Sequence, residues 1–248
     1  MSDRRGGLIQ RISQGARQYL GLATPDTLQA AGLMHGAEPQ DYPPGLCDEA
    51  SLPHDTILVQ DVSGSMTWSD CVPSRLEASK QAAEGFARKR AALSPGDRIA
   101  MVTFNIHGRV VLPLTEIVQL DRILMSLSVL RGAGGTDIAE GLKAANAVFG
   151  EDIARNPALA RHRRILLLTD GHGGRPLRWA THLKGAGVLL EVIGIGGDTS
   201  AVDERLLRQV ATTDVNGLVH YWFFRHTEGL VAHYENLASG LVYRGQGR

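Results

Sequence analysis

The apolar run at residues 165–168, Ile-Leu-Leu-Leu, constrains the fold of this 248-residue chain more than any other segment. Successive side chains of a β-strand point to opposite faces of the sheet, so four apolar residues in a row bury both faces. A strand that is buried on both faces is typical of the centre of a parallel sheet that helices cover on each side. We therefore expect residues 164–169 to form a central parallel strand.

Strand and helix patterns alternate around that strand. Short apolar runs predict strands, and apolar residues spaced three and four apart predict helices. The expected strands are 56–60, 98–104, 108–112, 164–169, 188–195 and 220–224, and the expected helices are 74–93, 120–130, 138–149, 176–184, 201–212 and 227–241. A hairpin at residues 105–107 makes one edge strand antiparallel. The alternation predicts an α/β fold with a doubly wound, mostly parallel central sheet, one antiparallel edge strand and flanking helices.

The chain divides into three parts, which we expect to be 1–53, 54–243 and 244–248. The first part contains apolar residues near one face of a predicted helix, namely Leu8, Ile12, Ala16, Tyr19 and Leu20. That helix fits packing on its own domain, docking to another protein, or lying on a membrane surface. Four prolines follow within residues 37–53 and predict an extended arm. The second part is the α/β domain, and the third is a short tail.

Composition and charge exclude several classes of protein. Lys plus Arg and Asp plus Glu number 26 each, so the net charge gives no reason to expect nucleic acid binding. The basic run at 161–164 directly precedes a strand and is interpreted as its solvated start. No stretch approaches the roughly 18 apolar residues of a membrane span, and the N-terminus lacks a signal-peptide pattern. With only two cysteines and no CxxC spacing, we expect a cytoplasmic protein with free thiols.

Oxygen-bearing side chains follow the first strand. Asp61, Ser63 and Ser65 alternate along one loop, so their side chains can converge on one point, and Gly64 allows the loop to turn. Ligands with only oxygen donors and few charges suit Mg²⁺, Mn²⁺ or Ca²⁺ rather than zinc.

Two further loops offer oxygen ligands. Thr136 lies between a glycine-rich segment and a predicted helix, and Asp170 ends the central strand. Ligands of doubly wound sheets bind outside the carboxyl ends of the strands, so all three loops should meet at one edge. We therefore predict a divalent metal site built from Asp61, Ser63, Ser65, Thr136 and Asp170.

These three elements, in this order, resemble the von Willebrand factor type A domain. The resemblance covers residues 54–243 and rests on the family's metal-ion-dependent adhesion site, which has the form Asp-x-Ser-x-Ser, then a Thr, then an Asp. Residues 134–138 (Gly-Gly-Thr-Asp-Ile) and 168–171 (Leu-Thr-Asp-Gly) also look like the family. The resemblance implies a Rossmann-like fold.

The resemblance also implies a function. Ser63 and Ser65 would bind the metal directly, and Thr136, Asp61 and Asp170 would bind it directly or through water. One coordination position would be open for an Asp or Glu carboxylate of a partner protein. Intracellular, bacterial-type family members commonly work with AAA+ ATPases, kinases or other stress and defence components, which are the partners that analogy suggests.

Other functions require residues that this sequence lacks at the corresponding positions. A haloacid dehalogenase-like phosphatase would need a second Asp as general acid where Ser63 stands. A serine hydrolase would need Gly-x-Ser-x-Gly, and a P-loop would need a Lys after the glycines at 132–135. No general acid, base or nucleophile accompanies the predicted ligands, so we do not expect an enzyme. The remaining alternative is an assembly subunit that acts through residues 1–53.

Residues near the predicted site have roles of their own. Trp68 and Asp70 would either contact the partner or rest on their own domain. Asp137 opens a helix and is interpreted as its cap rather than as a metal ligand. Cys71 follows the metal loop closely, which predicts an exposed thiol.

Overall fold

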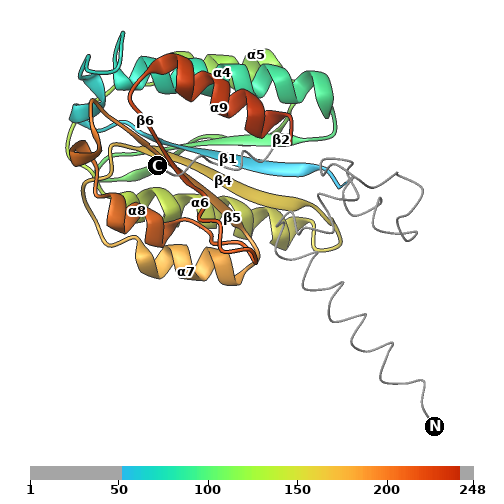
Figure 1. The fold of residues 1–248 in the computed structure, drawn as a ribbon. Coiled ribbons are helices and arrows are strands. Elements are labelled where there is room, and N and C mark those ends of the chain that lie inside the picture. The colour runs from blue at the N-terminus through green and yellow to red at the C-terminus, as the bar shows by residue number, and fades with distance from the viewer. Residues whose placement is uncertain (1–51, 241–248) are drawn as a thin grey trace, which may run out of the picture.

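One six-stranded sheet organises the chain in the computed structural model, which describes residues 52–240 (Figure 1). The strands are β1 (His54–Asp61), β2 (Arg98–Phe104), β3 (Gly108–Glu116), β4 (His162–Thr169), β5 (Leu189–Ile195) and β6 (Tyr221–Phe224). Their order across the sheet is β3-β2-β1-β4-β5-β6. All neighbours pair in parallel except β3, which pairs antiparallel with β2 at one edge. The expected fold class is confirmed.

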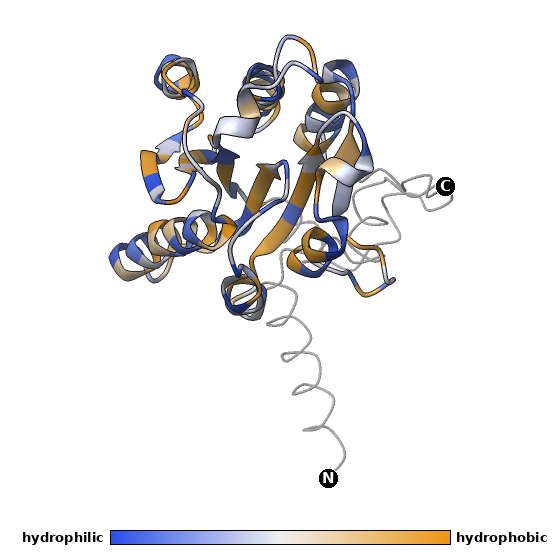
Figure 2. Cartoon of the chain, turned by 90° about the vertical axis from the view of Figure 1, so that its left-hand side faces the viewer, coloured by the Kyte–Doolittle hydropathy of each residue, from blue (hydrophilic) through white to orange (hydrophobic). Residues whose placement is uncertain are grey.

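Helices cover both faces of the sheet. One face carries α4 (Arg75–Leu93), α5 (Leu120–Ser128) and α9 (Thr227–Ala238), and the other carries α6 (Ile138–Arg155), α7 (Leu177–Gly185) and α8 (Glu204–Val210) (Figure 1). Two short 3-10 helices, η2 (Gly64–Thr67) and η3 (Thr199–Ala201), follow β1 and β5. The apolar residues concentrate on the strands between these two helical layers (Figure 2).

The central strand is buried on both faces, as its composition predicts. Leu166 and Leu168 of β4 pack in the core beneath α4, α5 and α9. Ile165 and Leu167 pack in the second core, beneath α6, α7 and α8. Parallel pairing with β1 and β5 brings the ends of three strands to one edge of the sheet.

Several elements differ from their predicted bounds, and the differences are largest at three of them. β3 continues past Pro113 to Glu116, because proline's missing N–H is tolerated on an edge strand. α6 continues past its last core residue, Phe149, to Arg155. The helix predicted at 201–212 is instead η3 followed by the shorter α8, which begins where the Asp203 carboxylate caps the Leu206 N–H at 3.0 Å.

Several expectations concern segments that the structure does not describe. The N-terminal helix, the proline-containing arm up to residue 51, and the tail at 244–248 lie outside the described residues. Within residues 52–240, no helix has the length and apolar character needed to cross a bilayer.

Candidate metal site

Asp61 is the last residue of β1, and its carboxylate is fully buried at the carboxyl edge of the sheet. Its Oδ1 accepts a hydrogen bond from the Ser63 N–H at 2.8 Å, and its Oδ2 accepts one from the Thr169 hydroxyl at 2.6 Å. Burial, with the nearby charge of Asp170 second, raises the pKa of Asp61 to about 6. The carboxylate is therefore held in place where its charge is poorly solvated.

The two predicted serines lie beside Asp61. Ser63 is buried and precedes η2, Ser65 is part of η2, and their Oγ atoms are 3.2 Å apart. Between them, Gly64 donates its N–H to the Gly134 carbonyl at 2.8 Å. A Cβ at Gly64 would lie 3.2 Å from that same oxygen. Gly64 therefore serves close approach of two loops, and its φ is not positive, so the turn itself does not require glycine.

Thr136 comes from the loop before α6 and is half-buried. The Ala133 N–H of this loop donates to the Val62 carbonyl at 2.8 Å, which ties the loop to the one after β1. On its other side, the Thr136 carbonyl is so close to Gly173 that a Cβ there would lie 2.2 Å from its oxygen. The next residue, Asp137, caps α6 by accepting the Ala139 N–H at 2.9 Å, which confirms its interpretation as a cap.

Asp170 follows β4 directly and is 2% exposed. Its Oδ2 accepts a hydrogen bond from Nη1 of Arg75 at 3.0 Å. The guanidinium of Arg75 also donates from Nε and Nη2 to the two oxygens of Asp70, and one of those oxygens accepts the Gly197 N–H at 2.8 Å. These hydrogen bonds from Arg75 hold the pKa of Asp70 below its usual value.

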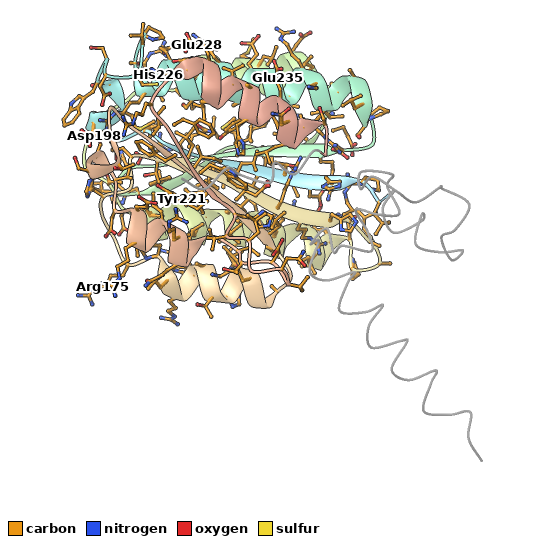
Figure 3. All side chains as sticks on the ribbon, viewed as in Figure 1. Arg175, Asp198, Tyr221, His226, Glu228 and Glu235 are labelled. Carbon is orange, nitrogen blue, oxygen red and sulfur yellow. The ribbon has the colours of Figure 1, made fainter. Side chains whose placement is uncertain are left out.

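The structure thus brings together all three loops that carry the predicted ligands. Asp61, Ser63 and Ser65 lie on the loop after β1, Thr136 lies before α6, and Asp170 lies after β4. Asp198, before η3, and Arg175, before α7, lie at the same edge, and Arg175 is on the side of the sheet that α7 covers (Figure 3). Within residues 52–240, no group of three or more His, Cys, Asp or Glu could hold a metal. The candidate site instead combines two carboxylates with three hydroxyls.

Sequence reasoning missed two residues of this region, Thr169 and Arg75. Thr169 is the last residue of β4, and nothing in a lone threonine there predicts a hydrogen bond to Asp61. Arg75 carried a usable signal, because a cation in the first turn of a helix opposes the helix dipole. An arginine in that position indicates acidic partners but does not identify them.

The structure also tests the expectations for Trp68 and Cys71, which flank the predicted site. The Trp68 side chain is 59% exposed, and its ring centroid lies 4.9 Å from the Arg75 guanidinium carbon, so it rests on its own domain with one face in solvent. The expected exposure of Cys71 is wrong. Its side chain is 1% exposed because it packs into the core beneath α4 and α9, with Sγ 3.6 Å from the Thr227 hydroxyl.

Residues 56–172 match the family model described as the von Willebrand factor type A domain. This segment contains all five predicted ligands, and its strands and helices have the order of the expected fold. By this match, residues 56–172 are similar to a von Willebrand factor type A domain.

Relatives and solved structures are similar to this domain. The bovine calcium-activated chloride channel regulator 1 is 30% identical over 172 residues, 66% of this chain and 18% of its own length. An uncharacterized protein of Synechocystis is 32% identical over 184 residues, 72% of this chain and 39% of its own length. The vWF domain of the type V pili tip protein Mfa5 from Porphyromonas gingivalis has a TM-score of 0.63 at 16% identity, covering 79% of this chain and 98% of that domain.

The chain spans less than two fifths of the length of both relatives. Their similarity therefore concerns one part of longer proteins. The structural similarity, at 16% identity, shows the shared fold alone.

Proposed function

We propose that this type A domain is a divalent-cation-dependent protein-interaction module. In this proposal Asp61, Ser63, Ser65, Thr136 and Asp170 hold Mg²⁺, for which Mn²⁺ or Ca²⁺ can substitute. An Asp or Glu carboxylate of a partner protein then completes the coordination. Domains of this family are generally interaction and adhesion modules. The observation that carries the proposal is the pair of buried carboxylates, Asp61 and Asp170, surrounded by hydroxyl groups at the carboxyl edge of the sheet.

The chemistry of the donor set fits a hard cation. Burial and the Asp170 charge raise the pKa of Asp61, so a positive charge between the two carboxylates would relieve an unfavourable state. Hydroxyl and carboxylate oxygens are the ligands that Mg²⁺ prefers, and Mg²⁺ requires about six of them in octahedral geometry. The bound cation would supply a coordination position that attracts a further carboxylate. Two protein carboxylates neutralise the ion, so an external acidic group is not repelled.

The surface beside the site offers room for a partner. A groove of about 680 Å³ lies between α4 and α5, and Thr67 and Gly132 line the end next to the metal loops. Apolar side chains form part of its wall, namely Leu76, Leu124, Leu127 and Leu130. We expect residues next to the partner's carboxylate to pack here. By analogy with the family, the partner is an AAA+ ATPase, a kinase or another stress or defence component.

Thermal unfolding in the presence of metal tests the site. Mg²⁺ or Mn²⁺ should raise the Tm of the wild-type chain, because a ligand that binds only the folded state stabilises it by mass action. A free metal concentration of about 100 times the dissociation constant stabilises the folded state by about 2.7 kcal/mol. Asp61→Ala and Asp170→Ala should abolish the increase. Glu84→Ala removes an exposed carboxylate from the middle of α4 and should leave the increase unchanged.

Partner binding is the second part of the test. A pull-down with wild-type protein should retain a partner in Mg²⁺ and lose it in EDTA, and the Ser63→Ala/Ser65→Ala variant should fail in both. A partner that remains bound in EDTA and to the double variant would contradict metal-dependent docking. An unchanged Tm response in both aspartate variants would show that the metal is bound elsewhere.

A further inference from the structure

We propose that Arg75 is a positioning residue of the metal site, which orients Asp170 toward the cation, and that Asp70 cancels the charge of Arg75 so that it does not repel that cation. The inference rests on the proposed function, because it assigns a role toward the same metal. It concerns two residues outside the predicted ligand set. It also explains why the chain places a guanidinium beside a cation site.

The orientation of Asp170 follows from the way Arg75 is anchored. Nε and Nη2 donate to the two oxygens of Asp70, so one edge of the planar guanidinium is fixed by a bidentate pair. This fixes the direction of the remaining nitrogen, Nη1, which donates to Oδ2 of Asp170 at 3.0 Å. Arg75 does not engage Oδ1 of Asp170. Arg75 therefore holds the carboxylate through Oδ2, and in this proposal Oδ1 is the oxygen that faces the cation.

The anchor itself is rigid. Asp70 accepts the Gly197 N–H at 2.8 Å, which connects the segment before α4 to the loop after β5. A Cβ at Gly197 would lie 3.2 Å from Oδ2 of Asp70, so the two segments are in close contact. The Arg75 N–H donates to the Trp68 carbonyl at 3.0 Å, and the Trp68 ring packs against the guanidinium. Backbone and side chain of Arg75 are both held.

The position of Arg75 carries a cost in folding free energy, which a role in the metal site would explain. Its side chain is 2% exposed, and desolvating an ion costs several kcal/mol unless its partners compensate. It is also the first residue of α4, where the helix dipole disfavours a cation. Neither solvent exposure nor helix stability accounts for an arginine here. The hydrogen bonds to Asp70 and Asp170 do.

Charge balance explains the presence of Asp70. Asp61, Asp170 and Asp70 contribute three negative charges and Arg75 one positive charge, which together give a net charge of −2 that a single divalent ion neutralises. Without Asp70, the uncompensated guanidinium would repel the incoming cation. Asp70 is therefore expected to favour metal binding without touching the metal.

Substitution of Arg75 distinguishes this proposal from simple electrostatics, because the two predict opposite changes in metal affinity. If charge alone mattered, Arg75→Ala would remove a positive charge and strengthen binding of the cation. If Arg75 orients Asp170, the same variant would weaken binding, since loss of a residue that orients a ligand typically costs about 10- to 100-fold in metal affinity. Asp70→Asn should also weaken binding, because it leaves the guanidinium charge uncompensated.

The experiment measures Mn²⁺ binding to the full chain by electron paramagnetic resonance of the free ion, followed by competition with Mg²⁺. We expect Arg75→Ala to weaken binding by about tenfold or more, and Arg75→Lys to recover part of the loss. Asp70→Asn should weaken binding by several-fold. Arg88→Ala, which removes an exposed arginine paired with Glu84 on the same helix, should leave the affinity unchanged.

Each outcome decides between the two proposals. Wild-type protein that binds no Mn²⁺ refutes the proposed function. Wild-type protein that binds Mn²⁺, together with a folded Arg75→Ala variant that binds it equally or more tightly, overturns only the positioning role. Circular dichroism in EDTA checks that each variant folds. If Arg75→Ala does not fold, the nearly isosteric Asp70→Asn decides: unchanged affinity overturns the inference.

Discussion

Gly173 shows how a single residue can control a predicted metal ligand. Its φ of +117° is disfavoured for other residues, and a Cβ would lie 2.2 Å from the Thr136 carbonyl oxygen. Substitution to alanine must push the loop after β4 away from the loop before α6. Because these loops carry Asp170 and Thr136, we expect the effect to reach the metal site.

We predict that Gly173→Ala lowers the free energy of unfolding by about 1–3 kcal/mol and abolishes the increase in Tm produced by Mg²⁺. Gly150→Ala is the matched control. It lies inside α6 with no atom within 4 Å of its added Cβ, so it should stabilise the protein by up to about 1 kcal/mol. Urea unfolding with and without Mg²⁺ measures both effects. A Gly173→Ala variant that keeps its full metal response would contradict the contact.

At the scale of elements, the sequence predicts type and order well and boundaries less well. The central strand β4 was predictable because its apolar run must bury both faces. The ends of α6 and α8 depend on polar contacts, which the spacing of apolar residues does not predict. Asp203 caps α8, and the buried Asp152 extends α6 by pairing with Arg98 of β2.

Some features of the candidate site could likewise be predicted from the sequence, and others could not. Asp61, Ser63 and Ser65 are close in sequence and follow a recognisable strand, so their loop could be predicted. Parallel topology places Asp170 beside them, because the ends of adjacent parallel strands meet at one edge. The contacts of Arg75 with Asp70 and Asp170 could not be predicted, since the second spans 95 residues and depends on packing.

The pairing of α6 with β2 gives a prediction at this scale. The Asp152 carboxylate, 10% exposed, accepts hydrogen bonds from Nη1 and Nη2 of Arg98 at 2.9 and 2.7 Å. Asp152→Ala should lower the free energy of unfolding by about 1–3 kcal/mol, because it leaves part of a buried charge without a partner. Glu151→Ala removes the adjacent exposed carboxylate, which pairs with Arg155, and should change stability by less than about 0.5 kcal/mol. Equal effects of the two variants in urea unfolding would contradict this.

At the scale of the whole molecule, the core that α9 covers contains buried ionisable side chains. Arg164 of β4, Glu191 of β5 and His233 of α9 are buried there among the apolar side chains. His233 packs between Trp222 and Phe224, with ring centroids 4.5 and 5.1 Å away. Burial lowers the pKa of His233 to about 4, and the charge of Glu191 opposes this shift only in part. Stability of the whole domain is thereby connected to pH.

The direction of this pH dependence follows from proton uptake. The unfolded chain protonates His233 near its ordinary pKa of about 6.5, whereas the folded chain does so only near pH 4. Between these values the unfolded state binds more protons, so the free energy of unfolding falls as pH decreases, by up to about 1.4 kcal/mol per pH unit. Above about pH 6.5 this contribution is constant. Asp61 acts in the opposite direction when no metal is bound, because its folded pKa is raised.

Substitution of His233 isolates its contribution from that of Asp61 and the other titrating groups, which are common to both proteins. We predict that His233→Phe, which suits the aromatic surroundings, reduces the loss of stability between pH 7.5 and 5.5 by about 1.4 kcal/mol relative to wild type. Urea unfolding in EDTA at both pH values gives the change in the free energy of unfolding for each protein, and the two changes are then compared. Because the comparison is made within each protein, any change in packing at pH 7.5 cancels. The same pH dependence in both proteins would show that His233 protonates equally in the folded and unfolded states, and that its burial on the inner face of α9 does not determine the stability of the domain in acid.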